Sequence, residues 1–367
     1  MRIRFITATP MNAAEGSGTY VGISTLMNAL RRAGAEVSLT TPSLHLPVFT
    51  AERLLFNRRL RPSRADLTVG FDMDGYALAG TGGAHIASIK GVIADEMRFE
   101  RGLTRLTMSI QARYERRHVR SAGMVLATSR YSAGKIADLY GKPERLALTP
   151  ELIDLDVWEK AIGAAPARPA SGEFTVLSVG RFFPRKRTSV LLEAAAALRH
   201  RLPGLRVRLV GDGPEGVRLR ALHERLGLGD RAVFLGHLGQ AAVAAEYRNC
   251  DLFCHPSVQE GFGIVFLEAM AARKPIVAAR AAAAPEVVPH ARFAEPDSAE
   301  SLAAAIETVA TDSGLRARMA AQGAQIVRQY EAAAVARTFL ELAREAVSIS
   351  TRGRRPRMEE DALNRLS

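Results

Sequence analysis

The chain has 367 residues, of which 47% are hydrophobic, and this length and composition support two domains of ordinary size with real cores. It contains no run of about 18 apolar residues, so we expect no membrane-spanning helix. The N-terminal strand pattern lacks the longer apolar core of a signal peptide. The formal net charge of +12 suits anionic lipid headgroups, phosphorylated molecules or nucleic acid. Nucleic acid is not expected as a partner, because no recognised nucleic-acid module appears and aromatic residues do not alternate with the basic runs.

Arginine accounts for most of the positive charge and is concentrated in the first half of the chain. A basic surface there predicts peripheral, salt-sensitive contact with an anionic membrane, although the same residues also fit an ordinary solvated surface. The arginines concerned are Arg53, Arg58, Arg59, Arg61, Arg64, Arg98, Arg101, Arg105, Arg113, Arg116, Arg117 and Arg120.

Predicted strands and helices alternate along the chain, which is the pattern of parallel α/β sheets. We predict a first domain over 1–162, a linker rich in Ala, Pro and Gly over 163–173, a second domain over 174–330 and a last helix over 331–348. The polar and charged segment 351–367 is expected to be disordered. Strands of the first domain are predicted near Ile3–Ala8, Val37–Thr40, Leu67–Gly70, His85–Ile89, Met124–Thr128 and Leu146–Thr149.

The loop between the first strand and its helix, Ala13–Tyr20, contains Gly16 and Gly18. Glycines in such a loop let a ligand approach the backbone closely. A dinucleotide fingerprint is a poor alternative, because the loop is long and the second strand is followed by Thr40-Thr-Pro-Ser, with no acidic residue for a ribose.

A second strand-to-helix loop is rich in cations. The strand Phe174–Gly180 ends in glycine and is followed by Arg181 and Lys186 before the next helical run. Cations at such a place can meet a diphosphate, so Arg181 and Lys186 are candidate binding residues. Arg185 and Arg187 belong to the same loop and are expected to be solvated.

Two cysteines, Cys250 and Cys254, bracket an apparent buried strand. The chain has no second cysteine pair that would complete a metal cage. We interpret both as reduced core residues, which is consistent with a cytosolic protein.

The most informative segment, Glu260–Glu268, follows that strand and leads directly into a helix. One carboxylate lies in the loop and the other inside the helix, with Gly261, Phe262 and Gly263 at the helix start. A helix start suits phosphate or sugar oxygens, and carboxylates accept hydrogen bonds from sugar hydroxyls. An ordinary strand-loop-helix connection is the alternative. Together with the cationic loop, the segment suggests a nucleotide-sugar site in an α/β crevice.

In this order and spacing, the motifs resemble those of the family 4 glycosyltransferases (glycosyl transferases group 1), which are of the retaining type. The resemblance spans nearly the whole chain and is densest from Phe174 to Val288. It rests on Val179-Gly-Arg-Phe with Lys186, Leu209-Val-Gly-Asp-Gly-Pro214, Val233-Phe-Leu-Gly236, the Glu260–Glu268 segment and Pro285-Glu-Val-Val288.

The resemblance implies an α/β protein with the GT-B fold, that is, two Rossmann-like domains with a cleft between them. It implies that the last helix crosses back to the first domain, and that the loop with Gly16 and Gly18 faces the diphosphate and the acceptor. Asp72-Met-Asp74 is an Asp-x-Asp, the metal motif of the other large glycosyltransferase fold. Metal ligation is one possibility there, and a loop aspartate facing the acceptor is the preferred interpretation.

The same resemblance assigns roles to the site residues. Glu268 should hold the nucleotide ribose, and Glu260 should contact the donor sugar together with backbone N–H groups at positions 261–263. Arg181 and Lys186 should neutralise the departing diphosphate. No carboxylate nucleophile is evident, and the family's usual proposal is same-face transfer assisted by the leaving phosphate oxygen.

The chain departs from the family at four places. Many members have His-Gly after the fourth or fifth strand, where this chain has Lys90-Gly91, so the histidine's role either passes to Lys90 or is lost. The alternative is that the Lys90 head simply reaches solvent. The other departures are Pro150-Glu-Leu152, Lys186-Arg187 and Arg273. They leave the identity of the sugar and the acceptor open.

These observations predict a metal-independent, hexosyltransferase-like enzyme that uses a UDP-, GDP- or ADP-sugar and no further cofactor. The expected acceptors are cell-surface glycans such as envelope polysaccharides, lipid-linked glycans or small molecules. The expected location is the cytoplasm, at or near the inner face of the membrane. The alternatives are a catalytically silent nucleotide-sugar- or glycan-binding protein, a GT-B nucleotide-sugar epimerase and an oxidoreductase.

Overall fold

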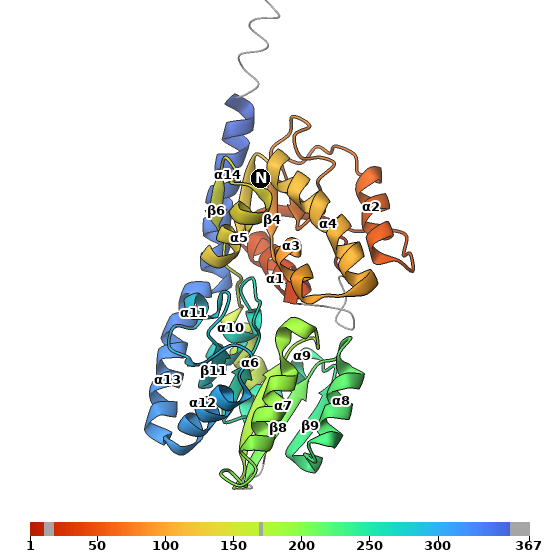
Figure 1. Cartoon of the computed structure of the whole chain (residues 1–367). Helices are drawn as coiled ribbons and strands as arrows, with labels where there is room; N and C mark the ends of the chain where they lie inside the picture. The colour runs from red at the N-terminus through yellow and green to blue at the C-terminus, as the bar shows by residue number, and fades with distance from the viewer. Residues whose placement is uncertain (11–17, 169–171, 353–367) are drawn as a thin grey trace, which may run out of the picture. The chain divides into compact units, whose positions relative to one another are not determined.

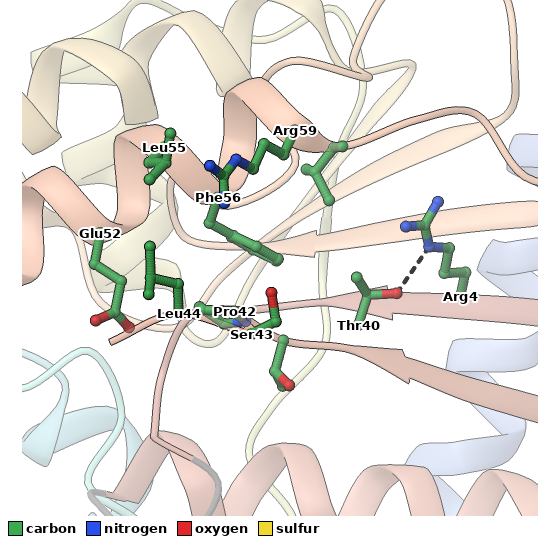
Figure 2. A pocket seen from close by; sticks show the side chains of 11 residues that line it. Arg4, Thr40, Pro42, Ser43, Leu44, Glu52, Leu55, Phe56 and Arg59 are labelled. Carbon is green, nitrogen blue, oxygen red and sulfur yellow. Dashed lines mark hydrogen bonds between the residues drawn. The ribbon is translucent and has the colours of Figure 1, made fainter. Parts of the chain in front are cut away.

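A computed structural model describes residues 1–10, 18–168 and 172–352 (Figure 1). Gly16 and segment 353–367, about which the sequence makes predictions, lie outside these residues. The chain divides into two compact units, each described by itself here. The first unit comprises residues 1–10, 23–150 and 333–367, and the second comprises residues 11–22 and 151–332.

The first unit is built on a six-stranded, wholly parallel sheet with the strand order β2-β1-β3-β4-β5-β6. The four central strands, β1, β3, β4 and β5, are rich in Ile, Val, Phe and Ala and are largely buried, as expected for a parallel sheet covered on both faces, whereas the edge strands β2 and β6 are more exposed. The bounds are β1 Arg2–Ile6, β2 Glu36–Thr40, β3 Leu67–Phe71, β4 His85–Ile89, β5 Met124–Ala127 and β6 Leu146–Leu148.

Helices connect these strands in the first unit. They are α1 Gly18–Arg32, which belongs to this unit from Ile23 onward, α2 Phe49–Arg59, α3 Ile93–Glu96, α4 Gly102–Ser121 and α5 Arg130–Tyr140. The start of α5 shows how sequence fixes a boundary, because the Ser129 hydroxyl accepts a hydrogen bond from the Ser132 N–H and caps the helix.

The last helix, α14 Ala332–Arg352, belongs to the first unit from Ala333 onward. Its buried face includes Phe339, whose ring meets Phe5 of β1 with centroids 6.2 Å apart. The helix continues beyond residue 348, so the start of the segment expected to be disordered is helical. Within the described part of the chain, no helix is both long enough and apolar enough to span a membrane.

The second unit has its own six-stranded parallel sheet, with the strand order β12-β11-β10-β7-β8-β9. The strands are β7 Phe174–Val179, β8 Leu205–Val210, β9 Ala232–Gly236, β10 Leu252–His255, β11 Ile276–Ala279 and β12 Arg292–Ala294. From β7 the chain moves outward through β8 and β9, then returns to β10 on the other side of β7. The strand order therefore reverses between β7 and β10, the place where open α/β sheets bind ligands.

The helices of the second unit cover this sheet. They are α6 Leu155–Ala164, α7 Thr188–Ala197, α8 Gly216–Arg225, α9 Gln240–Asn249, α10 Ile264–Ala271, α11 Ala284–Val287, α12 Ala299–Thr311 and α13 Ser313–Ile326. Cys250 and Cys254 are free, buried thiols beside and within β10, as predicted. Burial raises the pKa of Cys250 to about 12, so this thiol is protonated at neutral pH.

Candidate active site

The cationic loop and the carboxylate loop lie side by side because β7 and β10 are neighbours in the sheet. The Arg185 carbonyl oxygen accepts hydrogen bonds from the Val258 N–H (3.0 Å) and from the Ser257 hydroxyl (3.2 Å). These bonds fix the loop after β10 against the loop after β7. The two segments that the sequence selected separately therefore form one structure.

A buried ion pair lies at the centre of this structure. Lys186 ends the short 3₁₀ turn Pro184–Lys186, and its ammonium pairs with Glu260 Oε1. His255 closes β10, and its Nε2 lies 2.6 Å from the same carboxylate oxygen. The side chains of Lys186, Glu260 and His255 are 16%, 11% and 3% exposed, which removes most of the water that would otherwise screen them.

The charges of this cluster follow from its contacts. Burial alone would raise the pKa of Glu260, but the Lys186 ammonium and the His255 hydrogen bond outweigh it and hold this pKa well below its usual range. Burial lowers the pKa of His255 against the opposing effect of Glu260. At neutral pH the carboxylate is ionised and only accepts, so His255 is a neutral imidazole that carries its proton on Nε2.

Sequence reasoning missed His255, because it was read as part of an apolar strand. Its position at the carboxyl end of a strand, five residues before Glu260, is a signal that could have found it.

Glu268 lies in α10 and is buried against α9. The Tyr247 hydroxyl donates to Glu268 Oε2 at 3.0 Å and also lies 3.2 Å from the Val265 carbonyl oxygen. Burial raises the pKa of Glu268 to about 7, and the Tyr247 hydrogen bond opposes this rise. Glu268 therefore titrates near neutral pH, in contrast to Glu260. Tyr247 is a second residue that the sequence did not single out.

The glycines before α10 shape the start of this helix. Gly263 has a φ of +88°, and a Cβ built there would lie 2.7 Å from the Phe266 ring, so both the conformation and the space require glycine. Phe262 is buried and packs edge-to-face on Tyr330, with centroids 5.2 Å apart. A Cβ on Gly18 would lie 3.3 Å from Ile264 Cγ2, so the predicted glycine approaches the start of α10.

Arg181 is exposed, and its guanidinium lies over the Phe183 ring at 5.7 Å. The prediction that Arg185 and Arg187 are simply solvated is wrong. Arg185 is partly buried, and its guanidinium lies 4.7 Å from the centroid of the same Phe183 ring. Arg187 adopts a left-handed φ of +53°, and its guanidinium pairs with Asp297.

In the first unit, Lys90 lies directly after β4, as predicted, and is 8% exposed. Its N–H donates to Asp72 Oδ1 at 2.8 Å, and its ammonium lies 5.9 Å from the centre of the Phe71 ring. A lysine whose head simply reaches solvent does not fit this burial. A role in binding or catalysis stays a prediction.

The preferred interpretation of the Asp-x-Asp motif is wrong for Asp74. This carboxylate is fully buried and accepts from the Arg53 guanidinium (3.1 and 3.0 Å), the Asn57 amide (3.0 Å) and the Ala8 N–H (2.7 Å). Arg53 is consequently a core residue and no part of a basic surface. The pairing spans 21 positions in sequence, so neither partner could be read from local pattern.

The Asp72 carboxylate accepts hydrogen bonds from backbone N–H groups. Its Oδ1 accepts from the N–H groups of Lys90 and Gly91, at 2.8 and 3.4 Å, and its own φ is +53°. Burial raises the pKa of Asp72 to about 6. Within the described residues, no group of three or more His, Cys, Asp or Glu side chains is arranged to hold a metal ion.

Residues 164–326, which include both loops of the site, match the family model described as Glycosyl transferases group 1. Over this segment, which is less than half of the chain, the protein is similar to that family.

Among curated relatives, the chain is 32% identical over 180 residues to a D-inositol 3-phosphate glycosyltransferase of Segniliparus rotundus, covering 46% of this chain and 40% of the relative. It is 29% identical over 282 residues to a GDP-mannose-dependent alpha-(1-6)-phosphatidylinositol monomannoside mannosyltransferase of Mycobacterium tuberculosis, covering 74% and 72%. The matches to the first three relatives span only 40%, 41% and 39% of their lengths.

Among solved structures, the chain is similar to sucrose-phosphate synthase from Thermosynechococcus elongatus. The TM-score is 0.76 at 20% identity, and the match covers 95% of this chain and 99% of that chain. This likeness, together with the two parallel six-stranded sheets, confirms the expected GT-B fold.

Proposed function

We propose that this protein is a retaining glycosyltransferase that transfers a sugar from a nucleotide-diphosphate donor. The observation that carries the proposal is the buried Lys186–Glu260–His255 cluster at the strand-order reversal of the second sheet. Such a reversal is where α/β sheets bind nucleotides. A lysine and an arginine flank the loop there, and a second buried carboxylate, Glu268, follows in the adjoining helix.

In this proposal the donor's diphosphate lies against Arg181 and Lys186. Charge develops on the diphosphate as the bond to the sugar breaks, and preorganised cations stabilise that charge. The ammonium of Lys186 is already held by Glu260, so its position is fixed before the donor arrives. No metal is needed for this task if the two side chains perform it.

Glu260 is tied to a lysine and a histidine, and its depressed pKa makes it a weak base. We therefore assign it to binding the donor sugar's hydroxyls rather than to removing the acceptor's proton. The leaving phosphate oxygen would take that proton, with the new bond forming on the face from which the diphosphate leaves. Glu268 would accept hydrogen bonds from the ribose.

The names of two relatives guide the proposal for the donor and the acceptor. One relative is named as a GDP-mannose-dependent mannosyltransferase of a phosphatidylinositol monomannoside, and another is named as a D-inositol 3-phosphate glycosyltransferase. For this chain we propose a UDP-, GDP- or ADP-sugar donor and a glycan, lipid-linked or small-molecule acceptor in cell-envelope synthesis. We place the reaction in the cytoplasm, which also suits two free thiols.

A thermal-shift screen of UDP, GDP and ADP tests the donor site. A ligand at about 100 times its dissociation constant stabilises the fold by roughly 2.7 kcal/mol, which is a clear shift. The diphosphate that binds identifies the base, and its sugar derivatives are then tested for turnover, with NMR reporting the anomeric configuration of the product. Binding without turnover would favour a silent binding protein, and no binding by any of the three would contradict the proposal.

A further inference from the structure

The outward face of α4, in the first unit, carries exposed apolar side chains. Leu103, Leu106 and Ile110 are 74%, 59% and 39% exposed. Their spacing of three and four residues places them on one side of the helix. Figure 1 shows α4 crossing the face of the first unit that is turned toward the viewer. Large apolar residues gathered on one exposed surface mark an interaction site more often than isolated ones do.

The second half of the same helix is basic. Arg113, Arg116, Arg117 and Arg120 are exposed in its last turns. Because Arg113 and Arg117 follow Ile110 by three and seven residues, they continue the apolar stripe along the helix axis. Two more exposed arginines, Arg101 and Arg105, flank the apolar end.

The opposite face of α4 is already packed. Gln111, Ala112, Glu115, His118 and Val119 are its buried residues. Glu115 is the one acidic residue of the helix, and it is bonded inside the unit to the Tyr140 hydroxyl at 2.5 Å. The outward face therefore bears arginines without an acidic residue of the same helix, and its leucines are not needed to complete the core.

We propose that this outward face of α4 docks on an anionic membrane. Leu103, Leu106 and Ile110 would enter the boundary between headgroups and acyl chains, while the arginines contact anionic headgroups. A helix with an apolar patch, a strongly basic polar region and low net hydrophobicity is the type that lies in the membrane interface. Charge complementarity selects anionic lipid as the occupant. This surface belongs to a different unit from the Lys186–Glu260 cluster, so the proposal goes beyond the transferase function.

Vesicle cosedimentation of the full chain tests the charge requirement. Wild-type protein should bind vesicles of phosphatidylcholine mixed with phosphatidylglycerol and should bind pure phosphatidylcholine weakly. An arginine near such a surface contributes ~1 kcal/mol, so R113Q/R116Q should lower affinity for the anionic vesicles by roughly 25-fold. The matched control R225Q/R344Q removes the same charge from exposed positions on α8 and α14 and should stay within about twofold of wild type.

The apolar requirement is tested separately. L103N/L106N should lower affinity for the anionic vesicles by about tenfold or more, because buried apolar area is lost. V217N changes a residue that is 85% exposed on α8 and serves as the matched control. In L106W, the emission of the introduced tryptophan should shift to the blue when anionic vesicles are added, and V217W should show no such shift. Thermal unfolding with and without UDP checks that each variant keeps its fold.

Three outcomes would overturn the proposal. Equal binding of neutral and anionic vesicles would remove the charge argument. Wild-type binding by L103N/L106N, or an unchanged emission in L106W, would mean that the helix does not insert. Sedimentation velocity without lipid provides the third outcome: a dimer that L103N/L106N dissolves would show that a second copy of the chain covers this face.

Discussion

His255 and Lys186 meet on a single atom, Glu260 Oε1, from opposite sides of the strand-order reversal. The imidazole Nε2 lies 2.6 Å from that oxygen, and the ammonium pairs with it. A buried carboxylate is costly unless it is paired and hydrogen-bonded. Here one partner neutralises the charge and the other satisfies a lone pair, so an ionised Glu260 is stable in a nearly dry site. In the proposed function, this arrangement would hold the Lys186 ammonium in place for a ligand that carries more negative charge.

The cationic loop gives the first test. Lys186→Ala should lower turnover by roughly 10²–10³, the usual effect of removing one preorganised charge-stabilising group. Arg181→Ala should act in the same direction, and the double variant should be less than additive if both cations serve one diphosphate. Arg187→Gln removes a charge from the same loop, but this residue pairs with Asp297, so near-normal turnover is expected. Near-normal turnover in Lys186→Ala, with folding verified by thermal unfolding, would refute the assignment.

Substitutions of Glu268 and Glu260 should weaken the binding of different ligands. Glu268→Gln should weaken binding of the bare nucleoside diphosphate, because its proposed partner is the ribose. Glu260→Gln should leave the bare diphosphate nearly unaffected and weaken binding of the nucleotide sugar. Isothermal titration calorimetry with both ligands on both variants measures this. If Glu260→Gln weakened the bare diphosphate as much as the sugar donor, the division of roles would be wrong.

Nucleotide affinity should depend on pH through Glu268. Its pKa in the folded protein is raised to about 7, so the carboxylate becomes ionised, and accepts from a ribose, only as the pH rises through that value. Diphosphate affinity should therefore increase from pH 6 to pH 8, in the range set by that pKa. Because ionisation of a buried carboxylate disfavours folding, the stability of the unliganded protein should fall as the pH rises from the usual pKa of 4.5 to about 7 and should level off above that.

Tyr247→Phe tests the cause of this pH dependence. The Tyr247 hydroxyl donates to the Glu268 carboxylate, and this bond lowers the pKa of Glu268. Removing it should move the midpoint of the affinity profile to higher pH, which a purely structural role would not do. Calorimetry across the pH range for wild type, Tyr247→Phe and Glu268→Gln decides it, and an unmoved midpoint would count against the link.

The sequence was sufficient to place the catalytic candidates in loops at the carboxyl ends of strands. The alternation of predicted strands and helices, and the glycines that follow the strands, show where the strands end. It did not show that β10 pairs with β7, because the order of strands in a sheet is a tertiary property. The ion pair of Lys186 with Glu260, and the position of His255 beside it, depend on that neighbour relation. The role of Tyr247 could not be predicted either, because its hydrogen bond to Glu268 joins two different helices.

Two charged residues in the first unit, Arg53 and Asp74, have surroundings that the sequence pattern did not predict. Arg53 looked like one more arginine in a basic run, and Asp74 looked like half of a metal motif. The two residues form an ion pair inside the core, although they lie far apart in the sequence. Residue type and local spacing do not distinguish an exposed charge from one whose partner arrives from another element.

That ion pair supplies a prediction about metals. Removing one partner of a buried pair leaves an uncompensated charge and typically costs ~3–5 kcal/mol, so Asp74→Asn should lower the melting temperature clearly. Chelators should leave wild-type turnover unchanged, because cationic side chains perform the task of a metal in the proposed reaction. Loss of activity with EDTA that manganese restores, together with a stable Asp74→Asn variant, would return the Asp-x-Asp motif to metal binding.

Lys90 provides the last and most demanding test. It stands where many family members have a histidine, and its backbone is fixed by Asp72 directly after β4. If it takes over that role, it supplies a fixed positive charge near the donor sugar or diphosphate. Lys90→Ala should then lower turnover strongly, and Lys90→His should restore part of it. Lys90→Arg should be poor, because a planar guanidinium does not reproduce a compact ammonium.

Steady-state kinetics of the three Lys90 variants decide between a catalytic and a packing role. The ammonium also lies near the Phe71 ring, so thermal unfolding is measured in parallel to separate lost stability from lost chemistry. Lys142→Ala, at an exposed position of the same unit, is the control for removing a lysine. Wild-type turnover in Lys90→Ala would show that the histidine position of this family is functionally empty here. A matching fall in turnover and stability that Lys90→His does not relieve would assign Lys90 to packing.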